Sequence, residues 1–181
     1  MRPGRLSLAD PGVPSPDGVM PNRLIELSEV NFSYQGSDQL ILKDVNLSIP
    51  VGSRIALVGS TGSGKTTIAH LLLGLYTPTT GGLLLDGVHV SEEEMPAWQA
   101  NCAFVPQNIR LLDASVRENV AFCENPETID DNEVWAALEA AQFADFAAQV
   151  PYGLFAMCGE DGIKLSGGQR QRLSLARAFY R

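Results

Sequence analysis

The residues with the clearest chemical potential are eight consecutive positions, Gly59 to Thr66, which spell Gly-Ser-Thr-Gly-Ser-Gly-Lys-Thr. They fit the pattern G-x-x-x-x-G-K-[ST] at every fixed position. Glycines let the backbone wrap around a phosphate, so that several N–H groups point at its oxygens. Lys65 adds a full positive charge, and the hydroxyl of Thr66 can ligate Mg²⁺. The octet therefore predicts a binding site for nucleotide phosphates with Mg²⁺.

The segments on either side of the octet have the composition needed to position it. Residues 54–58 are short, apolar and partly β-branched, which is typical of a buried strand. Residues 67–74 have helical composition and end on a glycine. A strand–loop–helix junction is the context that this motif requires, and the helix would add the positive end of its dipole. The alternative, a glycine-rich turn that holds a lysine by chance, is not favoured.

Composition narrows the class of protein further. The 181 residues can form one sizeable core, or a modest domain with a smaller appendage. The net charge of −8 argues against nucleic acid as a partner. No apolar run approaches the roughly 18 residues of a membrane-spanning helix. The odd count of three cysteines has no metal-ligand spacing, so we interpret them as small apolar side chains in a reducing compartment.

The first third of the chain predicts a linker followed by strands. Residues 1–22 are rich in proline and glycine, which indicates a flexible lead. Residues 24–34 alternate apolar and polar side chains, as a half-buried strand does, and residues 40–49 form a second strand pattern. We expect these two strands to form a small antiparallel layer beside a main α/β sheet.

The rest of the chain alternates short strands with helices. We expect strands over 83–87 and 101–105, a short helix over 92–99, and helices over 115–122, 131–148 and 169–180. The predicted fold is an α/β P-loop NTPase core of the RecA type, with an N-terminal antiparallel β layer and an inserted helical subdomain. The expected divisions are a β layer and P-loop core over 23–107, a helical subdomain over 108–165 and a final helix region over 166–181.

A second motif, Leu165-Ser-Gly-Gly-Gln-Arg-Gln-Arg172, resembles the signature sequence of ATP-binding cassette (ABC) transporter nucleotide-binding domains. The resemblance covers residues 24–181. It implies binding of ATP and Mg²⁺, head-to-tail dimerisation with a second nucleotide-binding domain, and a transmembrane partner, fused or separate. In such a dimer Gly59–Thr67 of one copy would face Ser166–Gln169 of the other. The domain would then lie at the cytoplasmic face of a membrane.

The resemblance also assigns roles to single residues. Tyr34 matches the A-loop aromatic that stacks on adenine, and Gln107 matches the Q-loop glutamine that touches Mg²⁺ or the attacking water. Gln107 is thus a supporting residue, and Thr66 with Gln107 would hold the metal. The implied nucleotide-binding set is Tyr34, Gly59, Ser60, Thr61, Gly62, Ser63, Gly64, Lys65, Thr66, Thr67, Gln107, Ser166, Gly167, Gly168 and Gln169.

Two further segments resemble exporter-type domains, with departures. Ser115–Asn119 resembles the exporters' segment after the Q-loop, and Gly159–Gly162 resembles their G-E-R-G stretch. Asp161 stands where exporters commonly have arginine, and Met157 stands where they usually have an acidic residue.

No catalytic carboxylate is assigned. The family hydrolyses ATP with a Walker B aspartate and a following glutamate, which come after the signature helix. We expect that part of the core to be missing from this sequence. Leu83–Asp86 imitates an apolar run ending in aspartate, but Gly87 follows it, and Leu111–Asp113 fails similarly. We therefore expect this chain alone to be hydrolytically inactive and its full-length parent to be an ABC-type ATPase. The alternatives are a non-catalytic nucleotide-binding or interaction module, or a fragment without activity. GTPases and small-molecule kinases are disfavoured because no N-K-x-D motif is present.

Overall fold

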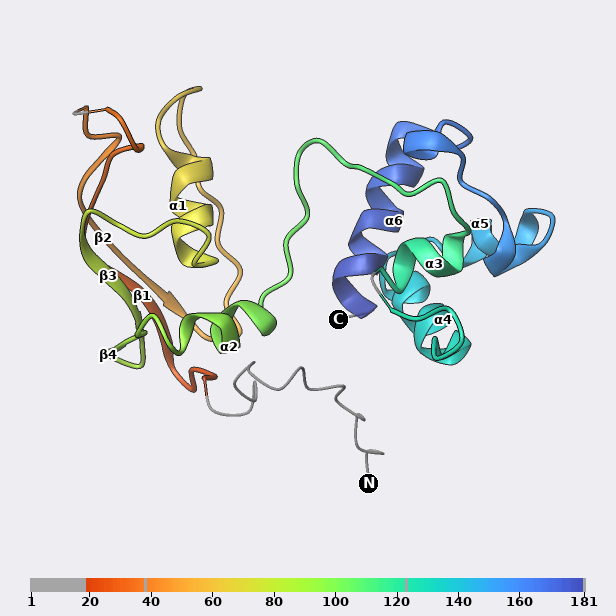
Figure 1. Ribbon diagram of the computed structural model, residues 1–181, viewed down its shortest axis with the longest axis horizontal. Helices are drawn as coiled ribbons and strands as arrows, with labels where there is room; N and C mark the ends of the chain where they lie inside the picture. Colours follow the sequence, from red (N-terminus) through yellow and green to blue (C-terminus); the bar gives the residue numbers. More distant parts are fainter. Residues whose placement is uncertain (1–18, 38, 123, 181) are drawn as a thin grey trace. The chain divides into compact units, whose positions relative to one another are not determined.

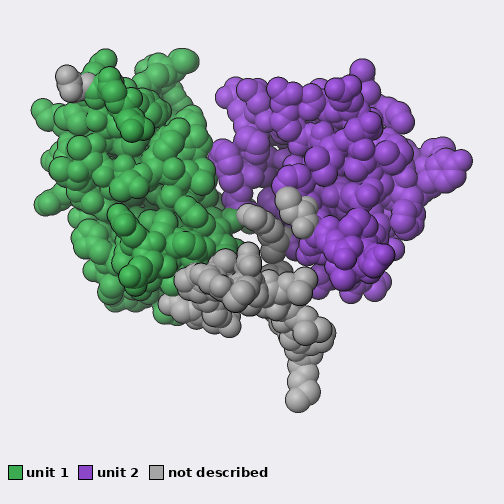
Figure 2. Space-filling view, in the orientation of Figure 1, with its two compact units in different colours: residues 1–102 green, residues 103–181 purple. Residues whose placement is uncertain are grey.

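The computed structural model describes residues 19–37, 39–122 and 124–180. The chain forms two compact units, residues 1–102 and 103–181 (Figure 2). Most of the predicted linker over 1–22 lies outside the described residues. At its end, Val19 already packs against the core of the first unit.

The first unit is built on an antiparallel sheet with the strand order β2-β1-β3-β4 (Figure 1). Leu27 in the central strand pairs with Leu47 on one side and Leu83 on the other, so apolar side chains line up across three strands. The predicted β layer is confirmed. The strand expected over 83–87 belongs to the same sheet, as β3. The strands are β1 (Leu24–Phe32), β2 (Leu42–Pro50), β3 (Thr80–Leu85) and β4 (Val88–His89).

Two short helices complete this unit. Helix α1 (Lys65–Leu72) starts directly at the lysine of the octet, and α2 (Met95–Ala100) begins three residues later than the predicted start of its helix. Leu71 of α1 and Trp98 of α2 are buried in the same cluster as the inward side chains of β1. The indole Nε1 of Trp98 also donates to the carbonyl of Leu72 at 2.8 Å. The last carbonyls of a helix lack partners within it, so this bond ties α2 to the end of α1.

Two predicted strands are wrong. Residues 54–58 and 101–105 are not strands in the described structure (Figure 1). Val58 is 92% exposed, Ile55 48% and Phe104 46%. A parallel strand is held by neighbouring strands and by helices over both faces. The composition of residues 54–58 and 101–105 favours a buried strand, but composition does not provide the neighbouring strands and helices that such a strand needs.

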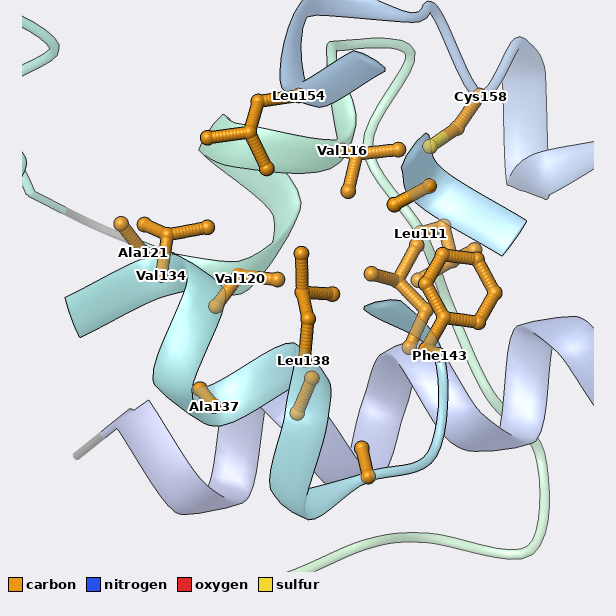
Figure 3. Packing of buried hydrophobic residues seen from close by; sticks show 14 of the residues in the cluster. Leu111, Val116, Val120, Ala121, Val134, Ala137, Leu138, Phe143, Leu154 and Cys158 are labelled. Atoms are coloured by element: carbon orange, nitrogen blue, oxygen red, sulfur yellow. The ribbon is translucent and has the colours of Figure 1, made fainter. Parts of the chain in front are cut away.

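The second unit is helical, as predicted, and has its own core (Figure 3). The helix expected over 131–148 is interrupted at Gln142, which adopts a positive φ of 57°. The buried side chains of Leu138, Phe143 and Leu173 come from different segments and join one cluster. The helices are α3 (Val116–Val120), α4 (Asp131–Ala140), α5 (Ala144–Gln149) and α6 (Gly167–Tyr180), with 3₁₀ turns η2 (Gly153–Phe155) and η3 (Glu160–Gly162).

A buried amide fastens α6 to the rest of this unit. Asn119, in α3, has no exposed surface, and its Nδ2 donates to the carbonyls of Leu112 and Ser115. Its Oδ1 accepts from Nη2 of Arg177, and its backbone carbonyl accepts from Nε of the same arginine. Charge-assisted bonds of this kind are stronger than neutral ones. They fix the C-terminal half of α6 against α3.

Candidate nucleotide-binding site

The phosphate-binding octet forms a tight loop that leads straight into α1. Gly62 and Gly64 adopt φ values of 84° and 87°, in the region that glycine reaches without strain. A Cβ at Gly64 would also lie 2.6 Å from Cδ2 of Leu42. A side chain at Gly64 would therefore strain the backbone and displace the Leu42 side chain of β2.

Lys65 closes this loop. Its Nζ donates to the carbonyls of Gly59 at 2.9 Å and Ser60 at 2.7 Å, and to Oγ of Ser63 at 3.3 Å. The ammonium group thus lies inside the curve of the loop, where the backbone N–H groups of the octet can also meet a phosphate. When a phosphate binds, Nζ of Lys65 would donate to its charged oxygens instead of to these neutral acceptors.

The loop borders a cavity of about 340 Å³. Tyr34, which follows β1, lies on its wall, and the Tyr34 hydroxyl shares a hydrogen bond of 3.0 Å with Oγ1 of Thr67. The structure thus brings the predicted adenine platform to the phosphate loop, although 33 residues separate the two side chains in sequence. The full lining is Tyr34, Ile41, Gly62, Ser63, Gly64, Lys65, Thr66 and Thr67.

The signature residues lie in the second unit, at the start of α6. The backbone N–H of Ser166 donates to Oε1 of Gln169 at 2.8 Å, and the N–H of Gln169 donates back to Oγ of Ser166 at 3.3 Å. This reciprocal pair is a capping box, which satisfies two groups at the helix start. Gly167 and Gly168 between them are exposed, so their N–H groups at the positive end of the helix dipole are open to a ligand.

Gln107 also lies in the second unit, in an exposed loop. The residues from Val105 to Arg110 face the first turns of α6 across a cavity of about 630 Å³, whose other lining residues are Gly167, Arg170 and Gln171. The structure therefore brings Gln107 to the signature helix. Thr66, the other predicted metal ligand, belongs to the first unit, so their joint metal site stays a prediction.

The two departures from the exporter pattern have local structural roles. Asp161 forms an exposed ion pair of 2.6 Å with Arg110, which follows the Q-loop. Met157 is 48% exposed and forms a single β-bridge with Ser115. The sequence pattern gave no sign of the Arg110–Asp161 pair, because 51 residues separate the partners.

Asp86 has a structural role at the start of the sheet. It lies in the two-residue turn between β3 and β4, at φ 53°, followed by Gly87 at φ 85°. Its carboxylate accepts from the backbone N–H groups of Asn22, Arg23 and Leu24 at 2.6–2.8 Å. These bonds lower the pKa of Asp86, and the bond from the N–H of Asn22 has the largest effect. The carboxylate therefore holds the chain as it enters β1.

The cysteines, candidate metal ligands and helices of the described residues add no further site. Burial raises the pKa of the Cys102 and Cys158 thiols to about 11, so both are neutral at pH 7. No cluster of three His, Cys, Asp or Glu side chains suited to a metal ion occurs among the described residues. None of the described helices combines the length and apolarity needed to cross a bilayer.

The side chains that surround Tyr34 could not be recognised from the sequence pattern. Phe32 and Tyr76 both contact its ring, and Tyr76 also contacts His70. No Phe, Tyr or Trp residue lies between Tyr34 and Tyr76 in the sequence, so only the fold shows that these rings meet. Ile41, which lines the cavity, was likewise missed.

The loop, its lysine and the helix that follows define a P-loop nucleotide-binding protein. The family profile described as ABC transporter matches residues 42–181. The chain therefore belongs to the ABC transporter family, as an ATP-binding domain. This confirms the resemblance drawn from the signature sequence and the predicted fold class. It does not favour the alternative of a non-catalytic nucleotide-binding or interaction module, or of a fragment without activity.

Similar proteins are large relative to this chain. The ATP-dependent lipid A-core flippase of Haemophilus influenzae (strain 86-028NP) is 40% identical over 157 residues, which cover 87% of this chain and 27% of the flippase. The flippase of the same name from Burkholderia orbicola (strain AU 1054) is 42% identical over 157 residues, covering 87% and 26%. The solved structure of a bacterial Atm1-family ABC exporter with ATP bound is 35% identical with a TM-score of 0.81, covering 94% of this chain and 29% of the exporter chain. The chain thus spans about a quarter of the length of these curated relatives.

Proposed function

We propose that this chain binds MgATP and that, by head-to-tail dimerisation, it powers a transmembrane partner of the exporter type. The observation that carries the proposal is the cavity in which Tyr34 and the P-loop meet. One wall offers an aromatic ring for a base, and the other offers Lys65 and backbone N–H groups for phosphates. The two ends of a nucleotide require these two kinds of surface.

Within the proposal, each predicted site residue has a part. Tyr34 stacks on adenine, Lys65 binds the terminal phosphates, and Thr66 with Gln107 holds Mg²⁺. The open N–H groups of Gly167 and Gly168 bind the γ-phosphate held by the P-loop of a second copy. The dipole at the start of α6 adds to that interaction, and the Ser166–Gln169 capping box keeps the turn in shape.

The proposed partner and location are supported by the relatives. The flippases and the Atm1-family exporter are transporters by name, and each is several times longer than this chain. We propose that a transmembrane domain, fused or separate, receives the work of ATP-driven dimerisation. The ATP-binding domain then lies at the cytoplasmic face of the membrane. The name of the flippases specifies lipid A-core and that of the exporter specifies no cargo, so the proposal does not extend to one transported substrate.

Hydrolysis is proposed to be weak in this chain. Phosphoryl transfer needs a group that positions the attacking water and a carboxylate that holds the metal. Gln107 can support the water, but Asp86 is engaged by three backbone N–H groups. We assign no general base among these 181 residues. ATP turnover at the rate of an intact ABC domain would contradict this part of the proposal.

The phosphate half of the proposal is tested at Lys65. Lys65→Ala should weaken binding of MgATP at least about tenfold, because it removes the full charge from the cradle. Lys43→Ala is the matched control, since Lys43 is an exposed lysine on β2 of the same unit. Titration calorimetry of the two variants decides the matter. Equal affinity of the two would contradict an ATP site in this cavity.

The dimer half is tested at the signature. Ser166→Ala should impair ATP-dependent dimerisation in analytical ultracentrifugation and leave ATP binding by the monomer nearly intact. Ser91→Ala is the control, because Ser91 is also an exposed serine that exchanges bonds with a side chain three residues later. Equal loss of binding and dimerisation in Ser166→Ala would argue against a shared site.

A further inference from the structure

The ring of Tyr34 is held by two other aromatic side chains. Phe32, in the last position of β1, lies 5.1 Å from it, and Tyr76 lies 5.8 Å from it, centroid to centroid. Both contacts are close to perpendicular, at 85° and 90°, while Phe32 and Tyr76 stack on each other at 16°. These are the arrangements that aromatic pairs prefer. Tyr34 is still 42% exposed and lines the cavity, so a base can reach it.

Tyr76 reaches this position because of the way α1 ends. The backbone N–H of Leu75 donates to the carbonyl of His70, and that of Gly74 donates to the carbonyl of Leu71. Gly74 has a φ of 67°. This is the Schellman arrangement, which reverses the chain at a glycine after a helix. The reversal brings Tyr76 back against the His70 ring, 5.1 Å away, and against the end of β1.

The hydroxyl of Tyr34 holds the far end of the side chain in place. It bonds to Oγ1 of Thr67 at 3.0 Å, and Thr67 is 97% buried in the first turn of α1. The neighbouring residue, Thr66, is the predicted metal ligand. One hydrogen bond therefore joins the proposed base platform to the helix that starts at the phosphate loop.

We propose that Tyr76 is a positioning residue of the nucleotide site, which holds the Tyr34 ring at the angle for base stacking, while the Tyr34–Thr67 hydroxyl pair sets the distance between base and phosphates. This inference rests on the proposed ATP site and adds the side chains that orient its base end. Tyr76 itself does not line the cavity with the P-loop. It acts through Tyr34.

The test compares two probes, MgATP and magnesium tripolyphosphate, which share the phosphates and differ in the base. In Tyr76→Leu the affinity for MgATP should fall about two- to tenfold, because the ring contacts of Tyr76 with Tyr34 and Phe32 are lost. The affinity for tripolyphosphate should stay within about twofold of the wild type, since the loop is unaltered. Tyr76→Phe keeps the ring and should restore ATP binding. Tyr152→Leu is the matched control, since Tyr152 is 84% exposed in the other unit.

The hydroxyl pair gives a second and independent measurement, which tests the other part of the proposal even if Tyr76→Leu does not fold. Tyr34→Phe and Thr67→Val should each weaken MgATP binding, and the double variant should weaken it no further than either single variant, since both remove the same bond. Thr67→Ser keeps the hydroxyl and should bind ATP like the wild type. Additive losses would overturn the role of the pair.

The outcomes separate this inference from the proposed function. Equal loss of ATP and tripolyphosphate in Tyr76→Leu would show that Tyr76 only supports the fold, which overturns the inference. Unchanged binding of both probes would overturn it as well, and the ATP site would stand. A wild-type chain that binds neither probe would contradict the proposed function itself, and the inference with it.

Discussion

The helical unit and the sheet unit differ in how fully their apolar side chains find partners within the unit. In residues 103–181 the apolar faces of α3, α4 and α6 meet in one cluster, with Val134, Leu138 and Leu173 fully buried (Figure 3). In the sheet unit β1 is well packed, yet the segment before the P-loop exposes Ile55 and Val58. Helices satisfy their backbone bonds internally, so a few of them can close a core among themselves. A strand depends on neighbours for its backbone bonds and its burial alike.

Polar groups show the same difference. Asn119 and Arg177 make several bonds inside the helical unit, and within the described part of the chain no buried side-chain nitrogen or oxygen lacks a partner. In the sheet unit, the half-buried Lys65 makes its bonds within an open loop, and the half-buried Asp86 makes its bonds in a turn. The phosphate loop thus lies in the sheet unit, and the signature residues lie in the helical unit.

The largest expected effect is in the helical core. Leu138→Ala should lower the free energy of unfolding by about 2–5 kcal/mol, because Leu138 is fully buried at the centre of the cluster. Leu112→Ala makes the same change at a leucine that is 44% exposed in the same unit, and it should cost less than about 0.5 kcal/mol. Urea denaturation followed by circular dichroism measures both. Equal costs would mean that the cluster is not the core of this unit.

The next prediction applies the same comparison to the sheet unit. Val30, in β1, has no exposed surface, whereas Val58 is 92% exposed. Val30→Ala should cost about 1–3 kcal/mol through lost burial and the cavity left behind, and Val58→Ala should be close to neutral. Thermal unfolding of the two variants measures the difference. A cost at Val58 equal to that at Val30 would show that residues 54–58 pack as a buried strand in solution.

A smaller effect separates two caps of the same kind. Ser115 is buried and forms a complete capping box with Glu118, whose pKa is lowered by the bonds from the Ser115 side chain and backbone. Ser91 makes matching bonds to Glu94, but it is exposed and a turn separates it from α2. Ser115→Ala should cost about 0.5–2 kcal/mol, and Ser91→Ala should cost less. Chemical denaturation of both variants tests the order, and the reverse order would contradict it.

The smallest effect is the pH dependence at Asp86. The pKa of Asp86 is lowered in the folded chain from its ordinary value of 3.8, chiefly by the bond from the N–H of Asn22. A lowered pKa means that the carboxylate stabilises the fold above pH 3.8, and that this contribution is lost as the pH falls through the folded pKa. Asp86→Asn tolerates the positive φ but removes the charge.

The measurement is the midpoint of thermal unfolding between pH 3 and 7, for the wild type and Asp86→Asn. The wild type should be more stable near neutral pH, and the gap should narrow as the pH falls below about 4. Lys43→Ala provides a control whose difference from the wild type should not follow this profile. A gap that stays constant down to pH 3 would contradict the role given to the carboxylate.

Much of the site could be predicted from sequence because its motifs are local. The octet, the signature and the strand patterns of β1 and β2 each depend on side chains within a dozen residues of one another, and the family match agrees with them. Residues 54–58 and 101–105 were mispredicted for the opposite reason. Their composition is right for a buried strand, but burial depends on segments that composition does not specify.

The sequence by itself determined the family, the phosphate loop and the turn that opens α6, since backbone conformation at glycines and caps is set by neighbouring residues. Only the tertiary structure decided which distant groups meet. Tyr34 reaches Thr67, Phe32 stacks on Tyr76, and Asp86 binds the first residue of β1. Such contacts join residues far apart in the chain, and they form because the sheet and the reversal after α1 bring the segments together, which no local pattern records.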